Sequence, residues 1–339
     1  MEIGTKNFGN NATLIMIRNR MGSTISFTDF GARIVDWVVD GKSIVLGFDS
    51  VEEYMTKDIY TGATIGRTSG RIKEGLVEIS GKTVQLEQNE RRQNLHGGAE
   101  NFASKTWNIE IFDGPDFAGI HFDLTSLAGE NGYPGNMKIR VTHTFDENGK
   151  WTVSYEASSD TDTIFNPTNH VYFNLNGTAS QSIDNHRLRL SASHFVPLLD
   201  HTQVVRGEIS KVGDTAFDFR TEKNLKEALK SDEEQITMVG GIDHPFVLDV
   251  PELDIEQARL SLDDLSISVY TDRPAIVIFT ANFGDRGVEY RGQRQVHHGG
   301  ITFETQVSPG SQQIPELGDI TLKADQPYQS TTVYQLNKG

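Results

Sequence analysis

The sequence predicts an all-β protein, a large antiparallel β-sandwich with very few short helices. Residues that favour strands alternate between apolar and polar along much of the chain, as in Thr24–Thr28 and Ser266–Tyr270. Helical spacing is confined to short windows, and no repeating order of strand, helix and strand appears. This pattern excludes a doubly wound α/β fold and favours stacked antiparallel sheets.

Strand signals recur along the whole chain. The clearest are Thr24–Thr28, Thr152–Tyr155, Arg187–Leu190, Ser266–Tyr270, Ala275–Phe279 and Thr331–Tyr334. Ala275–Phe279 is apolar throughout, which predicts a strand buried on both faces. We expect another strand from Thr163 to Phe173, because β-branched and aromatic residues surround a histidine there. Turn signals at Asp40–Gly41, Glu130–Gly135 and Glu147–Gly149 separate these segments.

Two short helices are expected. The stronger signal covers 221–234, where Asn224–Lys230 has helical spacing and Thr221 is a suitable cap. The second lies at Ser50–Met55. No internal repeat, low-complexity linker or shift in composition marks a boundary, so we expect a single domain over 1–339.

Composition narrows the function classes. The chain has 339 residues and a net charge of −16, without a basic cluster, which argues against nucleic-acid and anionic-membrane partners. It contains no cysteine, which excludes disulfides, thiolate metal sites and a cysteine nucleophile. We see no signal peptide and no apolar run long enough to span a bilayer. A soluble, cytoplasmic protein is the expectation.

Two segments contain candidate proton-transfer groups. His170 lies between amide and apolar side chains in Asn166–Leu175, and histidine is the side chain whose ordinary pKa is closest to neutrality. Glu304 lies in Gly299–Gln306, where alternation predicts a strand with Glu304 and Thr302 on one face. A hydrogen-bonded core histidine and an exposed glutamate are the plain structural interpretations of the same residues.

Three glycine-containing segments carry further polar candidates. They are Gly66–Ile72 with Arg67 and Arg71, Asn94–Gly98 with His96, and Gly240–Phe246 with Asp243. The first segment lacks the helix and Lys-Ser/Thr ending of a phosphate-binding loop. Asp243 could be a turn residue or accept hydrogen bonds from substrate hydroxyls, and His96 taken alone is more typical of a surface residue than of a site.

The order of these motifs is more specific than any one of them. Taken with Glu130–Gly135, it resembles the aldose 1-epimerase family, the galactose mutarotases, from about Gly31 to the C-terminal strands. The chain departs from the family at two positions. Gly70 replaces the usual asparagine before the loop arginine, and Pro167 stands where leucine is frequent, which puts substrate preference in question more than the activity.

The resemblance implies a β-supersandwich with a sugar cleft, and an enzyme that interconverts the α and β anomers of free galactose and glucose without a metal or organic cofactor. It further implies that such a protein supplies the α-anomer to a galactose kinase. By the same resemblance, Glu304 is the general base and His170 the general acid, and the substrate-binding residues are Arg71, His96 and Asp243.

The chemistry suits those residue types. Opening a pyranose needs a base for the proton of the C1 hydroxyl and an acid for the ring oxygen, and a carboxylate and an imidazolium fill these roles near neutral pH. An aromatic face commonly supports the apolar side of a hexose. Phe279 is our choice for it, ahead of Tyr60 and Trp37, although plain core packing is the slightly favoured interpretation of Phe279.

Three further functions stay open at this point. The first is a carbohydrate-binding module without catalysis, and the second is a relative acting on hexose 6-phosphates, for which Arg67 and Arg18 would be sources of positive charge. The third is a metal-dependent cupin-like enzyme using His297, His298 and Glu304, although adjacent strand residues point to opposite faces. The sequence leaves a monomer and a homodimer equally open.

Overall fold

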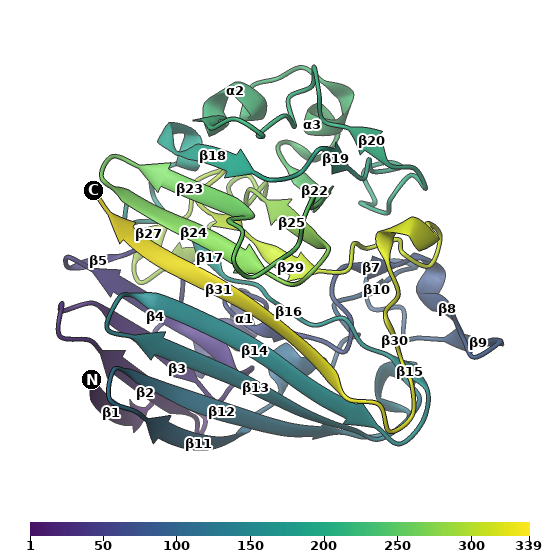
Figure 1. Cartoon of the computed structure of the whole chain (residues 1–339), viewed down its shortest axis with the longest axis horizontal. Coiled ribbons are helices and arrows are strands. Elements are labelled where there is room, and N and C mark those ends of the chain that lie inside the picture. The colour runs from purple at the N-terminus through teal and green to yellow at the C-terminus, as the bar shows by residue number, and fades with distance from the viewer.

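Three large antiparallel sheets and six two-stranded pairings make up the fold in the computed structural model, which describes residues 1–339 (Figure 1). The largest sheet has nine strands, in the spatial order β11 (Asn108–Asp113), β12 (Phe117–Ser126), β13 (Met137–Asp146), β14 (Lys150–Ser159), β31 (Tyr328–Lys338), β24 (Leu265–Thr271), β23 (Ala258–Leu262), β18 (Arg187–Leu190) and β21 (Lys223–Asn224). The C-terminal strand β31 lies between β14 and β24, so it joins the strands β11–β14 to the later strands of this sheet.

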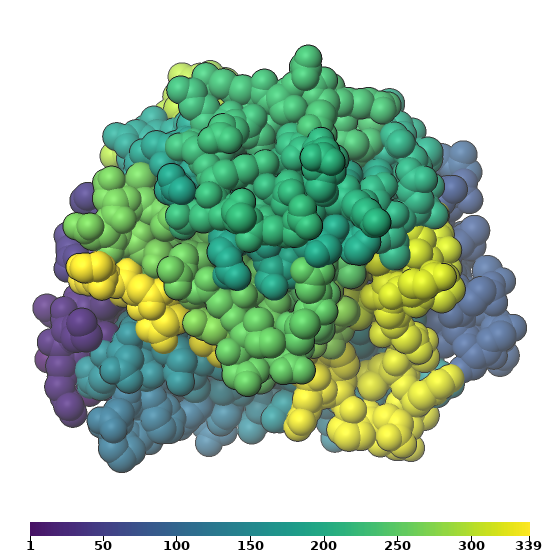
Figure 2. Space-filling model, turned by 45° about the horizontal axis from the view of Figure 1, so that its top comes forward, coloured from purple at the N-terminus to yellow at the C-terminus, as the bar shows by residue number.

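Two five-stranded sheets accompany it. The N-terminal sheet contains β1 (Glu2–Asn7), β2 (Thr13–Arg18), β3 (Thr24–Thr28), β4 (Arg33–Val39) and β5 (Lys42–Ser43). The other, which we call the site sheet, contains β20 (Ser210–Lys211), β19 (His194–Phe195), β22 (Asp243–Val247), β25 (Ala275–Phe279) and β29 (Glu304–Gln306). In the surface view of Figure 2, the C-terminal residues in yellow lie between the green upper part and the blue lower part.

Short strands complete the fold. They pair as β6 (Thr64–Ile65) with β16 (Thr168–Asn169), β7 (Arg71–Ile72) with β10 (Asn94–Leu95), β8 (Leu76–Ile79) with β9 (Lys82–Gln85), β15 (Thr163–Ile164) with β30 (Thr321–Leu322), β17 (Tyr172–Phe173) with β28 (Ile301–Thr302), and β26 (Glu289–Tyr290) with β27 (Gln293–Arg294). All of these pairings are antiparallel, which confirms the predicted all-β class.

Alternation along the strands builds the core. Every second residue of β13 is buried, and the same holds for much of β14. Trp37 of β4 packs edge-on against Phe145 of β13 and Trp151 of β14, with ring centroids 5.9 and 6.1 Å apart. The N-terminal sheet therefore packs on the nine-stranded sheet, and a cluster of 54 buried side chains continues into the site sheet.

The six predicted strands are confirmed, whereas the strand expected from Thr163 to Phe173 forms three short pieces. β15, β16 and β17 pair with three different partners, because the chain changes direction between them. Pro167 lies at the first break, where its missing N–H cannot support a continuous ladder.

The helices are short, as expected, but one differs from its prediction. Helix α1 (Val51–Thr56) begins where Ser50 accepts a hydrogen bond from the Glu53 N–H. The predicted helix over 221–234 is instead two helices, α2 (Leu225–Leu229) and α3 (Glu234–Val239). Asn224 rather than Thr221 caps α2, because residues 223–224 pair with β18 as an edge strand.

Single-turn 3₁₀ helices occupy several connections: Lys73–Gly75, Phe102–Ser104, Glu130–Gly132, Ile183–Asn185 and Pro315–Leu317. None of the helices has the length and apolar character that crossing a bilayer requires.

Three histidines lie inside the fold, where burial lowers the pKa of each. The pKa falls to about 3 for His143 and His244 and to about 4 for His186. The unfolded chain protonates such groups near pH ~6.5. Between these pH values the unfolded state binds more protons than the folded state, so acidification destabilises the fold.

We predict that the free energy of unfolding decreases by at least ~1.4 kcal/mol per pH unit as the pH falls from about 6 to about 4.5. Burial raises the pKa of Asp243 to about 6 and also raises the pKa of Asp29 and of Asp272, which opposes the trend, but burial lowers the pKa of five histidines. Urea unfolding at several pH values measures the slope, and His143→Leu should reduce it. A stability that stays constant or rises over this range would contradict the prediction.

Candidate active site

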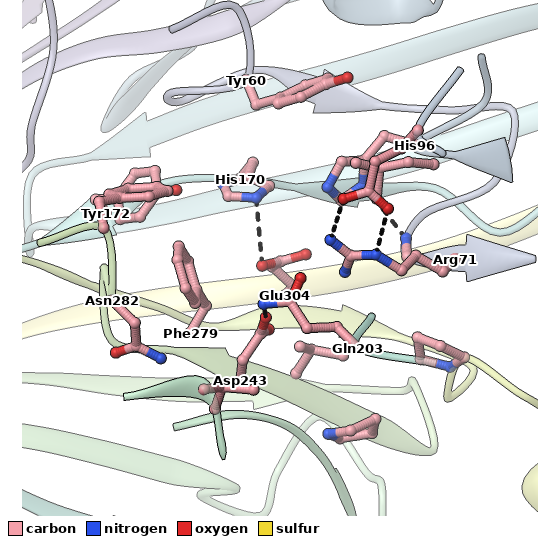
Figure 3. Close-up of a pocket in the computed structure, with 18 of the residues that line it drawn as sticks. Tyr60, Arg71, His96, His170, Tyr172, Gln203, Asp243, Phe279, Asn282 and Glu304 are labelled. Atoms are coloured by element: carbon pink, nitrogen blue, oxygen red, sulfur yellow. Dashed lines mark hydrogen bonds and ion pairs between the residues drawn. The ribbon is translucent and has the colours of Figure 1, made fainter. Parts of the chain in front are cut away.

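A pocket of about 530 Å³ opens over the site sheet, within the range of ~300–1,000 Å³ that small-molecule sites occupy. The residues predicted from the sequence all line it, and Figure 3 shows them converging: Arg71, His96, His170, Asp243, Phe279 and Glu304. They come from different strands and loops, so only the folded chain brings them together.

Strand register sets His170 against Glu304. β17 and β28 pair Tyr172 with Thr302, and two residues further along the same register lie His170 and Glu304. Side chains two residues apart on a strand share a face, so this pair faces the same pocket as Tyr172. His170 Nε2 lies 3.5 Å from Glu304 Oε1.

Both members of this pair are almost fully buried, with exposed fractions of 5% for His170 and 3% for Glu304. The Thr302 hydroxyl donates a hydrogen bond of 3.0 Å to Glu304 Oε1, which confirms that these two residues share a face. His170 Nδ1 is buried without a hydrogen-bond partner. Its ring is therefore positioned by packing and by the backbone rather than by a third polar side chain.

The backbone of His170 is fixed by the loop before β6. The His170 N–H donates to the Ala63 carbonyl, and the His170 carbonyl accepts from the Gly62 N–H, both at 2.9 Å. Buried Arg33 holds this loop by donating to the Thr61 carbonyl at 3.2 Å, and it donates to the Ala103 carbonyl at 2.7 Å. Burial lowers the pKa of Arg33 to about 10, so the guanidinium stays charged at neutral pH.

Asp243 begins β22 and pairs with Phe279 on β25. Burial raises the pKa of its carboxyl group to about 6, and the nearby Arg71 cation limits the increase. Gln203 Nε2 donates to Asp243 Oδ2 at 2.6 Å. Asp243 is therefore ionised at neutral pH and offers its other oxygen as an acceptor in the pocket.

Arg71 is oriented by Glu90. Its Nε and Nη2 atoms donate to the two oxygens of Glu90, both at 2.8 Å, in a bidentate ion pair. Burial alone would lower the pKa of Arg71, but the hydrogen bonds to Glu90 and the nearby Asp243 raise it overall. The third nitrogen, Nη1, stays available for a ligand oxygen.

His96 is held as a neutral hydrogen-bond donor. Its Nδ1 accepts from the Gly70 N–H at 3.3 Å, so the ring proton is on Nε2. Burial, followed by the neighbouring His170 and Arg71, holds the pKa of His96 well below its ordinary value. Its ring packs 4.8 Å from that of Tyr60, which also lines the pocket.

Two of the three aromatic residues considered for the sugar face line the pocket, and one does not. Phe279 lines the pocket and packs edge-on against Phe283 and Tyr172, with ring centroids 5.0 and 6.1 Å away. Tyr60 lies at the opposite wall (Figure 3). Trp37 is fully buried between the sheets and cannot contact a ligand, so that candidate was wrong.

The departure from the family at Gly70 has a local physical explanation. Gly70 has a φ of 71°, and a Cβ there would lie 2.5 Å from Pro309 Cγ. In this chain Pro309 therefore fills the space beside Gly70 and becomes part of the pocket wall.

Neither arginine considered for phosphate recognition reaches the pocket. Buried Arg67 donates to backbone carbonyls, including those of Ser126, Leu127 and Gly135. Arg18 ends β2 and is exposed. The positively charged groups at the pocket edge are instead Arg286, paired with Asp58 at 3.3 Å, and Lys57.

The proposed cupin-like metal set is not assembled. His298 Nε2 contacts the Gly240 carbonyl at 2.9 Å, and His297 Nδ1 accepts from the Gly284 N–H at 3.1 Å. Neither histidine lines the pocket that contains Glu304. No group of three or more His, Cys, Asp or Glu side chains is arranged to hold a metal ion.

Sequence reasoning missed Glu90 and Gln203. Glu90 follows a polar run, Gln88-Asn89, with no motif around it, and Gln203 lies in a loop whose position depends on the tertiary fold. Only their contacts with Arg71 and Asp243 reveal them.

A buried carboxylate–imidazole pair beside an arginine, a neutral histidine and a second carboxylate can transfer protons and form hydrogen bonds with a small hydroxyl-rich molecule. Comparison with known proteins places the chain among enzymes that act on sugars. The family model described as Aldose 1-epimerase matches residues 13–335.

Individual relatives cover most of the chain. A galactose mutarotase of Homo sapiens is 34% identical over 297 residues, which is 87% of this chain and 84% of the relative. An aldose 1-epimerase of Haemophilus influenzae is 32% identical and covers 94% of both chains. The solved structure of a galactose 1-epimerase from Lactobacillus acidophilus superimposes with a TM-score of 0.90 at 29% identity, covering 100% of this chain and 98% of that one.

The chain therefore belongs to the aldose 1-epimerase family, and it is a carbohydrate isomerase with the galactose mutarotase fold.

The bidentate contact between Arg71 and Glu90 yields a testable prediction. Glu90→Gln removes the charged acceptor that orients Arg71, so we expect KM for a hexose to rise about tenfold while kcat changes little. Steady-state anomerisation kinetics measure both constants. Glu74→Gln is the matched control, because Glu74 pairs with exposed Arg92 at the surface. Equal KM values for the two variants would contradict a role for Glu90 in substrate binding.

Proposed function

We propose that this enzyme interconverts the α and β anomers of free hexoses such as galactose and glucose, with Glu304 as general base and His170 as general acid. One observation carries the proposal: His170 Nε2 and Glu304 Oε1 lie 3.5 Å apart, facing one pocket. The two oxygens that exchange protons in mutarotation are bonded to the same carbon, C1. A catalytic acid and base must therefore be close neighbours.

Ring opening follows from this geometry. Glu304 removes the proton of the C1 hydroxyl, the C1–O1 bond becomes a carbonyl, and the C1–O5 bond breaks. The bonding pair stays on O5, which takes a proton from His170. Each positioned proton transfer contributes about a hundredfold or more in rate.

Ring closure uses the same two groups with reversed roles. After rotation about the C1–C2 bond, neutral His170 removes the O5 proton as O5 attacks the other face of the carbonyl. Protonated Glu304 returns a proton to O1. The protons balance over one cycle, and both groups recover their starting states.

The remaining pocket groups suit recognition of a free sugar. Arg71 Nη1 and His96 Nε2–H are donors, and Asp243 is an acceptor. Phe279 offers an aromatic face for the C–H side of the ring. Sugar hydroxyls both donate and accept hydrogen bonds, so this mixture matches a hexose.

Free hexoses are favoured over their phosphates. Each cation at the pocket edge already has a carboxylate partner, Arg286 with Asp58 and Lys57 with Glu53. A phosphate would have to displace those partners or be bound against them.

Glu304→Gln tests the base directly. The amide keeps the shape of the side chain but cannot accept the C1 proton, so we expect at least a hundredfold loss of kcat with sugar binding retained. Polarimetry with fresh α-galactose measures turnover, and calorimetry measures binding. Near-normal rates for the variant would remove Glu304 from the mechanism.

The same anomerisation assay on the wild-type enzyme separates the proposed function from the alternatives. Galactose, glucose, xylose and hexose 6-phosphates are compared, each with and without EDTA. Sugar binding without acceleration of anomerisation would favour a binding module. Faster turnover of the phosphates would indicate a hexose 6-phosphate epimerase, and loss of activity in EDTA would indicate a metal-dependent enzyme.

His170→Asn tests the acid. Asparagine retains a polar side chain but cannot transfer a proton at neutral pH, so we expect kcat to fall by more than the affinity for galactose does. The same polarimetric assay provides kcat and KM. An unchanged kcat would assign the acid role to His96 instead.

A further inference from the structure

Gln203 lies at the tip of a short hairpin that reaches the pocket. The hairpin spans 197–206 and is closed by a β-bridge between Leu198 and Val205, with the Leu199 N–H donating to the Val204 carbonyl at 2.7 Å. At the tip, Gln203 has a left-handed φ of 60°, and its N–H donates to the Asp200 carbonyl. The backbone of the tip therefore directs one specific side chain into the site.

The hairpin is fixed to the strand that carries Asp243. Gln235 of α3 accepts from the Leu198 N–H at 2.7 Å and donates to the Leu198 carbonyl at 3.1 Å. The same amide oxygen contacts His244 Nε2 at 3.1 Å, and His244 is the residue after Asp243. Through these contacts the base of the hairpin and β22 form one hydrogen-bonded unit.

The contact between Gln203 and Asp243 fixes which way the amide faces. An ionised carboxylate only accepts hydrogen bonds, so the amide nitrogen of Gln203 must face Asp243 Oδ2. The amide oxygen of Gln203 then points away from that carboxylate and receives no hydrogen bond from the protein. Figure 3 shows Gln203 directed into the pocket, and both residues line it.

Two acceptors consequently lie next to each other in a pocket whose other polar groups include donors. Asp243 has one oxygen not used by Gln203, and Gln203 has a free amide oxygen. Arg71, His170, Glu304 and Glu90 are the charged and titratable groups near this carboxylate. Hydroxyl groups on adjacent carbons of a sugar are the ligand chemistry that fits two neighbouring acceptors.

We propose that Gln203 is a specificity-determining residue that forms a diol subsite with Asp243. Its amide nitrogen positions the carboxylate for one substrate hydroxyl, and its amide oxygen accepts a hydrogen bond from the neighbouring hydroxyl. The subsite rests on the proposed hexose-anomerising function. It selects sugars by the hydroxyl groups held there, away from the reacting C1 centre.

Gln203→Met tests the subsite, because methionine has a similar length but no hydrogen-bonding amide. We expect KM for galactose to rise about tenfold, with a smaller change in kcat, since one hydrogen bond to each of Asp243 and the substrate is lost. His201→Met is the matched control, on an exposed residue of the same hairpin. Thermal unfolding of both variants verifies that the fold is intact.

Deoxygalactoses provide a second test, which identifies the substrate hydroxyl that Gln203 binds. Wild type and Gln203→Met are compared on galactose and on the 2-, 3-, 4- and 6-deoxy sugars. We expect the variant's penalty in kcat/KM to shrink for the deoxy sugar that lacks the hydroxyl bound by Gln203, and to keep its full size for the others.

The outcomes separate the two proposals. A wild-type enzyme that turns over galactose, together with a Gln203→Met variant of unchanged KM, would overturn the diol subsite alone. A penalty of equal size on every deoxy sugar would also overturn it. A wild-type protein that accelerates no anomerisation would overturn the proposed function, and the subsite with it.

Discussion

The register between β17 and β28 is the constraint on which the site depends. It pairs Tyr172 with Thr302 and, two residues further along, sets His170 across from Glu304. Pairing within the site sheet then fixes Glu304 from its other side, because Val277 of β25 pairs with Glu304. Residues far apart in the chain thus become neighbours through backbone pairing, with side chains two residues apart on one face.

Packing on the opposite face holds that register. Phe173 and Phe303 alternate with the site residues and point into the core, where both are fully buried and their ring centroids are 6.0 Å apart. The Tyr334 hydroxyl of β31 donates to the Phe303 carbonyl. A slip by one residue would move Glu304 into the core and Phe303 into the pocket, at the cost of burying a carboxylate among apolar side chains. Fold stability and the geometry of the pocket are therefore set by the same alternation.

Local patterns in the sequence were sufficient for the six regular strands, because alternation and turn residues report which face a residue occupies, but they did not reveal the breaks between Thr163 and Phe173. The same alternation placed Glu304 beside Thr302, and the family resemblance supplied the other candidates. Patterns could not reveal Gln203 or Glu90, whose importance lies in contacts across the fold. The helix predicted from Thr221 begins only at Leu225, because pairing of residues 223–224 with β18 outweighs helical propensity there.

The two histidines of the pocket lie in different electrostatic environments. Their ring centroids are only 5.3 Å apart, so two imidazolium ions would repel each other strongly. Burial, the neighbouring His170 and the charged Arg71 all favour the neutral form of His96, whose Nδ1 accepts a hydrogen bond from a backbone N–H. His170 faces a carboxylate instead. His96 can therefore offer only a neutral N–H to a ligand oxygen, whereas His170 lies beside the carboxylate of Glu304, its partner in the proposed mechanism.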